Sequence, residues 1–163
     1  MSMIGNLRRV PEERLKLLLA DAALFDDFLE EEGDRSMTLD LDKAWHGLQF
    51  LLTETAWDGP EPLNFLVGGG RELEVDMGYG PPRAFVAAEV SAIAGALAPL
   101  TRDVLKTRFD PKAMTAAELY PTIWDRADEH AENLEYLLGA FDRVKAFVEA
   151  AAAAKDGMLV YLT

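Results

Sequence analysis

The sequence predicts an α+β fold: one compact, mostly helical domain spanning residues 1–163, with a small sheet that pairs strands from the two chain ends. Three observations predict it. Residues 3–10 have a short, strand-like apolar pattern, residues 158–162 form a run of β-favouring side chains, and a long helical pattern precedes that run. The length of 163 residues and the 50% apolar content suit a single globular domain.

Helical spacing dominates the segment that follows the first strand. Pro11 favours a helix start because proline tolerates the first turn, and the acids after it favour the positive end of the helix dipole. Residues 21–32 carry a second helical stripe. We predict a third and central helix over residues 39–52, with Asp40 or Asp42 as its N-cap. Its buried stripe would consist of Leu41, Trp45, Leu48 and Leu52.

The second half of the chain begins with a glycine- and proline-rich stretch at residues 68–82, which predicts a long irregular loop. A strand at 83–86 and a helix at 87–97 should follow it. Thr101 can cap a short helix, and residue 111 marks a turn or a new helix start. Helical spacing from Tyr120 to about Lys155 predicts one long helix, which Asp156-Gly157 would end.

Composition limits the classes of partner and location. The formal charge of −13 and the scattered basic residues argue against nucleic acid and anionic membranes as partners. No apolar run is long enough for a membrane span, and the N-terminal residues do not form a signal peptide. We therefore expect a cytoplasmic protein.

The chemistry-bearing residue types are few. The absence of cysteine excludes thiolate chemistry, and two histidines, His46 and His130, are too few for a multi-histidine metal site. One histidine with carboxylates is the alternative that stays open, but we expect no metal and no cofactor. Glu72, Glu74 and Asp76 alternate along the glycine-rich stretch, which favours an exposed acidic edge over a cation site.

The candidate catalytic residues are Asp42 and His46, because a spacing of four on a helix would let the carboxylate orient the imidazole. The favoured explanation of the same spacing is structural, namely an acid at the helix start that satisfies a half-buried histidine. Arg83 follows a rigid Gly-Pro-Pro and is a candidate ligand-binding residue for a carboxylate or phosphate. Tyr79, Tyr120 and Trp124 lie beside glycine or proline, where an aromatic side chain either lines a pocket or fills a loop.

Several segments resemble the YfbM-like family of uncharacterised bacterial proteins, a family with a domain of unknown function. The most specific are Asp42-Lys43-Ala44-Trp45-His46 and Tyr79-Gly80-Pro81-Pro82-Arg83. The start at residues 1–5 and the segments 109–111 and 120–124 fit as well. The resemblance covers the whole chain and implies a compact α+β domain in a bacterial cytoplasm, with no activity attached.

Two functions remain open from the sequence. The first is a binding or interaction module that recognises a small molecule or a protein partner. The alternative is an enzyme that acts on a small anionic substrate in a pocket around Asp42, His46 and Arg83.

Overall fold

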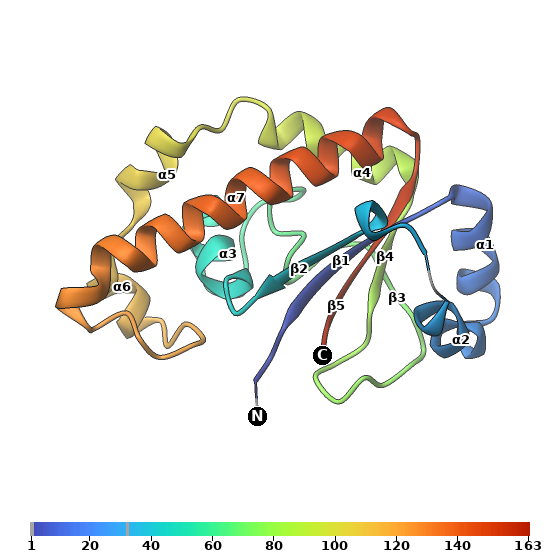
Figure 1. The fold of residues 1–163 in the computed structure, drawn as a ribbon, viewed down its shortest axis with the longest axis horizontal. Helices are drawn as coiled ribbons and strands as arrows, with labels where there is room; N and C mark the ends of the chain where they lie inside the picture. Colours follow the sequence, from blue (N-terminus) through green and yellow to red (C-terminus); the bar gives the residue numbers. More distant parts are fainter. Residues whose placement is uncertain (1, 32) are drawn as a thin grey trace.

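The computed structural model describes residues 2–31 and 33–163, and its central feature is a five-stranded antiparallel sheet in the order β2-β1-β5-β4-β3 (Figure 1). The strands are β1 (Gly5–Val10), β2 (Thr38–Asp42), β3 (Arg71–Glu72), β4 (Arg83–Phe85) and β5 (Gly157–Leu162). The C-terminal strand β5 lies in the middle and pairs with β1 along its whole length, from Gly5–Leu162 to Val10–Gly157. The predicted pairing of the two terminal strands is confirmed.

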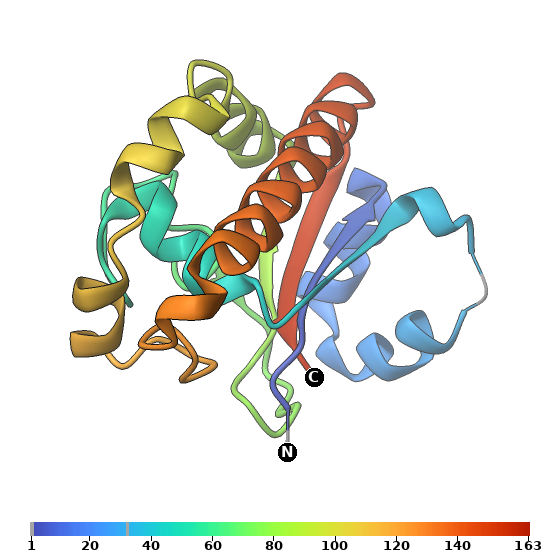
Figure 2. The ribbon, with the colours of Figure 1, turned by 60° about the vertical axis from the view of Figure 1, so that its left-hand side comes forward.

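Seven α-helices surround the sheet in the described part of the chain. They are α1 (Glu12–Ala20), α2 (Phe25–Glu30), α3 (Trp45–Thr53), α4 (Ala87–Leu97), α5 (Arg102–Arg108), α6 (Pro111–Ala116) and α7 (His130–Ala153). Figure 2 shows α7 crossing in front of the sheet, with α1 and α2 at the other side. Most of the helices therefore cover a single face of the sheet, and the predicted single α+β domain with a long C-terminal helix is confirmed.

The alternation of β5 divides the interior into two cores, because successive side chains of a strand point to opposite faces. Met158 and Val160 join the larger core, together with α3, α4 and α7. Leu159 faces the smaller core, which it shares with residues of α1 and α2. Strand β5 is thus covered on both of its faces, which explains why its residues are almost all apolar.

The predicted helix at 39–52 is wrong in its first half. Residues Thr38–Asp42 form the edge strand β2, which pairs with β1, and the helix begins only at Trp45. Asp42 has a φ of 49° and its backbone N–H donates to Asp40 Oδ1 at 2.7 Å, so the chain turns at this point. The alternation of leucine and aspartate over residues 39–42 was a strand signal. The predicted stripe of Leu41, Trp45, Leu48 and Leu52 is buried, as expected.

The long C-terminal helix starts later than predicted, at His130 instead of near Tyr120. Residues 121–126 form turns and residues 127–129 a short 3-10 helix, and local side-chain bonds to the backbone hold this segment together. Trp124 Nε1 donates to the carbonyl of Leu119, and the His130 ring bonds to the carbonyl of Trp124 at 2.9 Å. These bonds give the backbone polar groups an alternative to helix formation.

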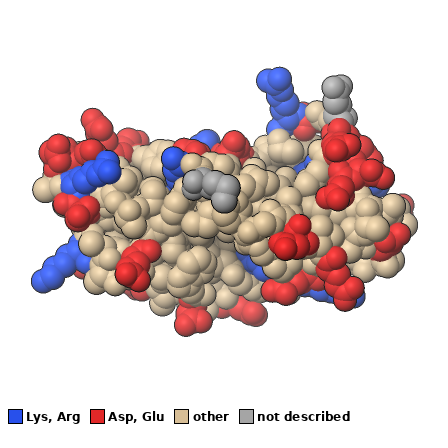
Figure 3. Space-filling view, turned by 90° about the horizontal axis from the view of Figure 1, so that it is seen from below, with Lys and Arg blue, Asp and Glu red and all other residues tan. Residues whose placement is uncertain are grey.

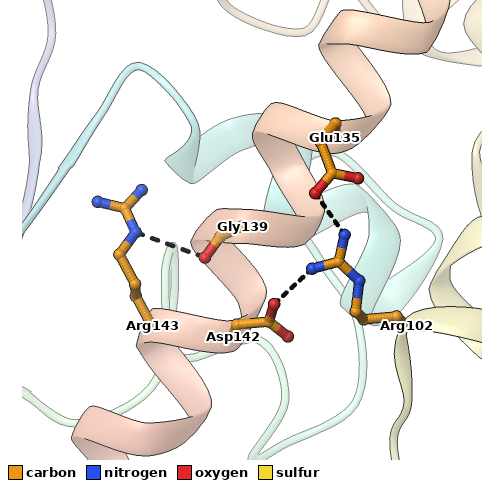
Figure 4. A network of polar contacts seen from close by, with 5 residues as sticks. All are labelled: Arg102, Glu135, Gly139, Asp142 and Arg143. Carbon is orange, nitrogen blue, oxygen red and sulfur yellow. Dashed lines mark hydrogen bonds and ion pairs between the residues drawn. The ribbon is translucent and has the colours of Figure 1, made fainter.

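An exposed ion-pair network joins α5 to α7 (Figure 4). The guanidinium of Arg102 donates to both Glu135 and Asp142, about two turns apart on α7 and on the same side of it. Arg143 donates to the carbonyl of Gly139 within the same helix. Because these groups are exposed, the network orients α5 more than it stabilises the fold.

The charge of the protein is unevenly spread over its surface. Figure 3 shows one face, on which acidic side chains gather mainly toward the two ends and the centre is mostly uncharged. Within residues 2–31 and 33–163, no helix combines the length and the apolar character needed to cross a bilayer.

Gly5 provides a test of how closely α3 approaches the sheet. A β-carbon on Gly5 would lie 2.7 Å from the Trp45 Cβ and 3.0 Å from its Cγ, so Gly5→Ala must displace the start of α3. We expect a loss of about 1–3 kcal/mol in the free energy of unfolding, measured by urea denaturation. Gly139→Ala is the matched control, because nothing lies within 4 Å of its added β-carbon. Helix propensity should make that variant more stable by about 0.5–1 kcal/mol. Equal stability of the two variants would contradict this packing.

Candidate functional site

A pocket of about 170 Å³ lies on the main-core side of the sheet, where β5 extends past the start of β4. It brings together two of the predicted ligand-binding residues, Tyr79 and Arg83. Its walls are built from α3, the loop after α3, the glycine-rich loop and the end of β5. The lining residues are Trp45, Trp57, Leu66, Val67, Glu72, Tyr79, Gly80, Pro81, Arg83, Val160, Tyr161 and Leu162.

Trp45 forms the rigid inner wall of this pocket. Its side chain packs directly against Gly5, where any β-carbon would collide with it. Its Nε1 donates to the carbonyl of Met3 at 3.1 Å, and the side chain is 2% exposed. The indole is therefore fixed by both packing and a hydrogen bond, and a ligand would meet a preformed surface.

Trp57 forms the outer wall and is 60% exposed. Its ring centroid lies 4.4 Å from that of His46 and 6.0 Å from that of Trp45. His46 in turn stacks on Trp45 with a centroid distance of 4.7 Å and an interplanar angle of 7°. The imidazole thus supports the two indoles from behind, and it is 1% exposed.

Both ring nitrogens of His46 are engaged by the backbone. The Tyr120 N–H donates to Nδ1 at 2.9 Å, which leaves Nε2 as the protonated nitrogen that donates to the carbonyl of Ala56 at 3.1 Å. Burial lowers the pKa of His46, and the bond to Ala56 opposes this shift. The ring is neutral and has no unoccupied nitrogen, so the structure gives it a supporting role instead of that of a general base.

Asp42 is separated from His46 because it ends a strand instead of starting a helix. Its carboxylate accepts a hydrogen bond from the Tyr136 hydroxyl at 2.8 Å. Burial, and then this bond, raise the pKa of Tyr136 to about 12. The pair ties β2 to α7 and lies outside the pocket lining. Asp42 and His46 therefore do not form the acid–base pair that their spacing of four residues suggested.

Arg83 lies at the floor of the pocket, half-buried, on the same face of the sheet as Val160. Its Nη1 donates to the carbonyls of Gly68 and Gly69. Burial lowers the pKa of Arg83 to about 10, and the charge of Glu72 opposes the shift. The side chain therefore remains cationic at neutral pH.

The remaining edge of the Arg83 guanidinium is open to a ligand. Among the described residues, all hydrogen bonds of its side chain involve Nη1, and no carboxylate lies within ion-pair distance. Glu72 pairs with Arg83 across β3 and β4 and shares the pocket, but it is exposed. The Nε and Nη2 groups can thus receive an anion.

The other two predicted ligand-binding residues lie beside the pocket and do not line it. Tyr120 stacks on Trp45 with a centroid distance of 6.0 Å, and its hydroxyl accepts from the Met3 N–H. Trp124 is 1% exposed and packs against Gly47. Both aromatic side chains fill space in the structure.

Sequence reasoning missed Trp57. The signal was available, because a tryptophan in the polar segment Ala56-Trp57-Asp58-Gly59-Pro60 has no helical or strand pattern to bury it. Large apolar residues that remain exposed are informative for this reason.

The fold and the site define a small α+β domain with one aromatic wall of two indoles and an arginine beside it. The whole chain matches the family described as "Domain of unknown function (DUF1877)", with residues 1–161 aligned, and the protein belongs to that family. The resemblance to YfbM-like proteins is thereby confirmed.

The fold is similar to that in "The Crystal Structure of a Protein of Unknown Function YfbM from Escherichia coli", with a TM-score of 0.79 and 23% sequence identity. The match covers 98% of this chain and 99% of that chain. At this identity the likeness establishes the fold alone. A comparison with curated protein sequences gives no match.

The neutral state of His46 predicts a pH dependence of stability. Burial lowers the folded-state pKa below the ordinary value of 6.5, so below that pH the unfolded chain takes up a proton that the folded chain does not. This contribution to stability is complete above pH 6.5 and is lost progressively as the pH falls from that value to the lower pKa of the folded state. We expect urea denaturation between about pH 7.5 and 5.5 to show a smaller loss for His46→Asn than for the wild type.

Leu18→Ala is the control for this experiment, because it removes packing from the smaller core on the other face of the sheet and changes no titratable group. It should keep the wild-type difference between the two pH values. If His46→Asn lost as much unfolding free energy between the two pH values as the wild type, the buried neutral imidazole would not be the source of the pH dependence.

Proposed function

We propose that the protein is a binding domain for a small organic anion that carries one flat ring, and that Trp45, Trp57 and Arg83 form its site. The observation that carries the proposal is their convergence on one pocket of about 170 Å³. That volume is below the range of roughly 300–1,000 Å³ typical of drug-sized ligands, so it suits a single ring.

The chemistry of the walls supports this ligand class. The exposed indole of Trp57 offers a flat apolar surface for stacking, with the buried Trp45 as the inner wall, and the open edge of the Arg83 guanidinium offers paired donors for a carboxylate. Exposed Glu72 is the opposing feature, because its charge repels an anion in the same pocket. Glu72 would therefore lower affinity and limit binding to ligands that reach Arg83.

The binding role is favoured over the enzyme alternative by the state of His46. Its two nitrogens are bound to backbone groups, and Asp42 is bound to Tyr136. Neither is placed to move a proton of a ligand beside Arg83. We also propose a cytoplasmic location, as expected from the sequence. The protein has no cysteine and therefore needs no oxidising compartment to form disulfides.

The test uses benzoate as the probe and the indole N–H signals of the three tryptophans in NMR as the readout. We expect binding with a Kd of about 1 mM and shifts of the Trp45 and Trp57 signals, with Trp124 as an internal control that does not move. Benzamide, which has the same shape without the charge, should bind more weakly by roughly tenfold. Equal binding of the two probes would exclude the role of Arg83.

Two variants test the walls separately. Trp57→Ala should weaken benzoate binding about fivefold, because one stacking surface is lost. Glu72→Gln should strengthen it by roughly twofold to fivefold, since a like charge is removed. Glu74→Gln is the matched control: it removes an exposed acid next to the pocket without touching the lining. A benzoate affinity unchanged by Trp57→Ala would refute the proposed site.

A further inference from the structure

A second cavity, of about 400 Å³, borders Gly69 and Gly70 of the glycine-rich loop and, unlike the first pocket, has acids but no base in its lining. Its apolar walls come from the 61–64 loop, β4 and α4. The lining residues are Glu61, Pro62, Asn64, Gly69, Gly70, Phe85, Glu89, Ala92 and Ile93. None of them is basic, and the cavity lies within the size range of small-molecule sites.

We propose that this cavity binds an organic cation, a primary amine with an apolar or aromatic body. Glu61 and Glu89 are its charged residues, and neither forms an ion pair with a base in the described chain. One oxygen of Glu89 accepts the Val86 N–H at the start of α4, which fixes the carboxylate and leaves its second oxygen available. The protein charge of −13 attracts cations to such a site.

Two oxygens and an aromatic edge converge above the α-carbon of Gly69. The position that a β-carbon of residue 69 would take lies 3.9 Å from Asn64 Oδ1, 3.9 Å from Glu61 Oε1 and 3.4 Å from Phe85 Cε1. Because residue 69 is glycine, with a φ of 72°, no side chain projects among these three groups into the cavity. An ammonium group in the cavity beside them would have an amide oxygen, a carboxylate and a ring as neighbours.

Asn64 supplies an independent observation. Its Oδ1 is buried and has no hydrogen-bond partner in the described structure. A buried acceptor without a donor is unfavourable, and an ammonium N–H can supply the missing bond. The unpaired oxygen thus points to a donor ligand, in agreement with the two carboxylates.

The probe for this site is benzylamine, and the readout is the NMR signals of the Asn64 side-chain amide and of the Gly69 and Gly70 amides. We expect these signals to titrate with a Kd of about 1 mM at low salt. Benzyl alcohol, a neutral molecule of the same shape, should bind about fivefold more weakly or not at all. Equal binding of the two molecules, or the absence of benzylamine binding up to about 20 mM, would overturn the proposal.

Substitutions separate charge from shape. Glu61→Gln should weaken benzylamine binding about threefold, whereas Glu149→Gln, an exposed acid of α7 outside the cavity, should not change it. Ala92→Phe should abolish binding by filling the cavity from α4. Ser91→Phe, its exposed neighbour on the same helix, should leave binding unchanged. Retention of benzylamine binding in Ala92→Phe would place the amine elsewhere and refute this site.

Benzoate binding at the Trp57 pocket serves as the fold check for each variant. If Ala92→Phe still binds benzoate but loses benzylamine, the second site alone has been removed. If benzoate fails to bind the wild type while benzylamine binds as expected, the proposed function is wrong and the second site stands.

Discussion

The contact between Trp45 and Gly5 is the constraint on which the rest of the structure depends. The indole lies on the backbone of β1 at a point where no side chain intervenes, and its nitrogen bonds to the carbonyl of Met3. The contact fixes the start of α3 against the sheet. His46 then stacks on the same indole, and Trp57 packs on His46, so the outer wall of the pocket is positioned through a chain of rings. A residue with a side chain at position 5 would remove the base of this arrangement.

The parts of the fold that could be predicted are those with strong local patterns. The two terminal strands, α1, α4 and the Thr101 cap of α5 follow from alternation, helical spacing and cap chemistry. The errors arose where two patterns overlap. Residues 39–42 alternate like a strand, but the apolar residues that follow have helical spacing. The prediction extended the helix back over the strand for this reason. Residues 121–129 fit a helical period, but hydrogen bonds of Trp124 and His130 to the backbone hold them in turns.

The candidate site was only partly predictable, because its geometry depends on distant contacts. Arg83 and Tyr79 were expected to contact a ligand and do share a pocket. The pairing of Asp42 with His46 depended on a helix that does not extend that far. The partner of Asp42, Tyr136, and one of the two backbone partners of His46, Tyr120, lie more than 70 positions away in sequence. No local spacing contains that information.

The three glycines at residues 68–70 contact both candidate sites, of which one holds an arginine and the other only acids. Carbonyls of this segment hold Arg83, and its bare α-carbon at Gly69 borders the acidic cavity. Because these glycines have no side chains, Arg83 on the one hand and Glu61 and Glu89 on the other can lie close to the same segment. The segment itself fills neither the pocket nor the cavity. A side chain at Gly69 would project toward Asn64, Glu61 and Phe85 and reduce the acidic cavity, while the carbonyls that hold Arg83 belong to the same short segment.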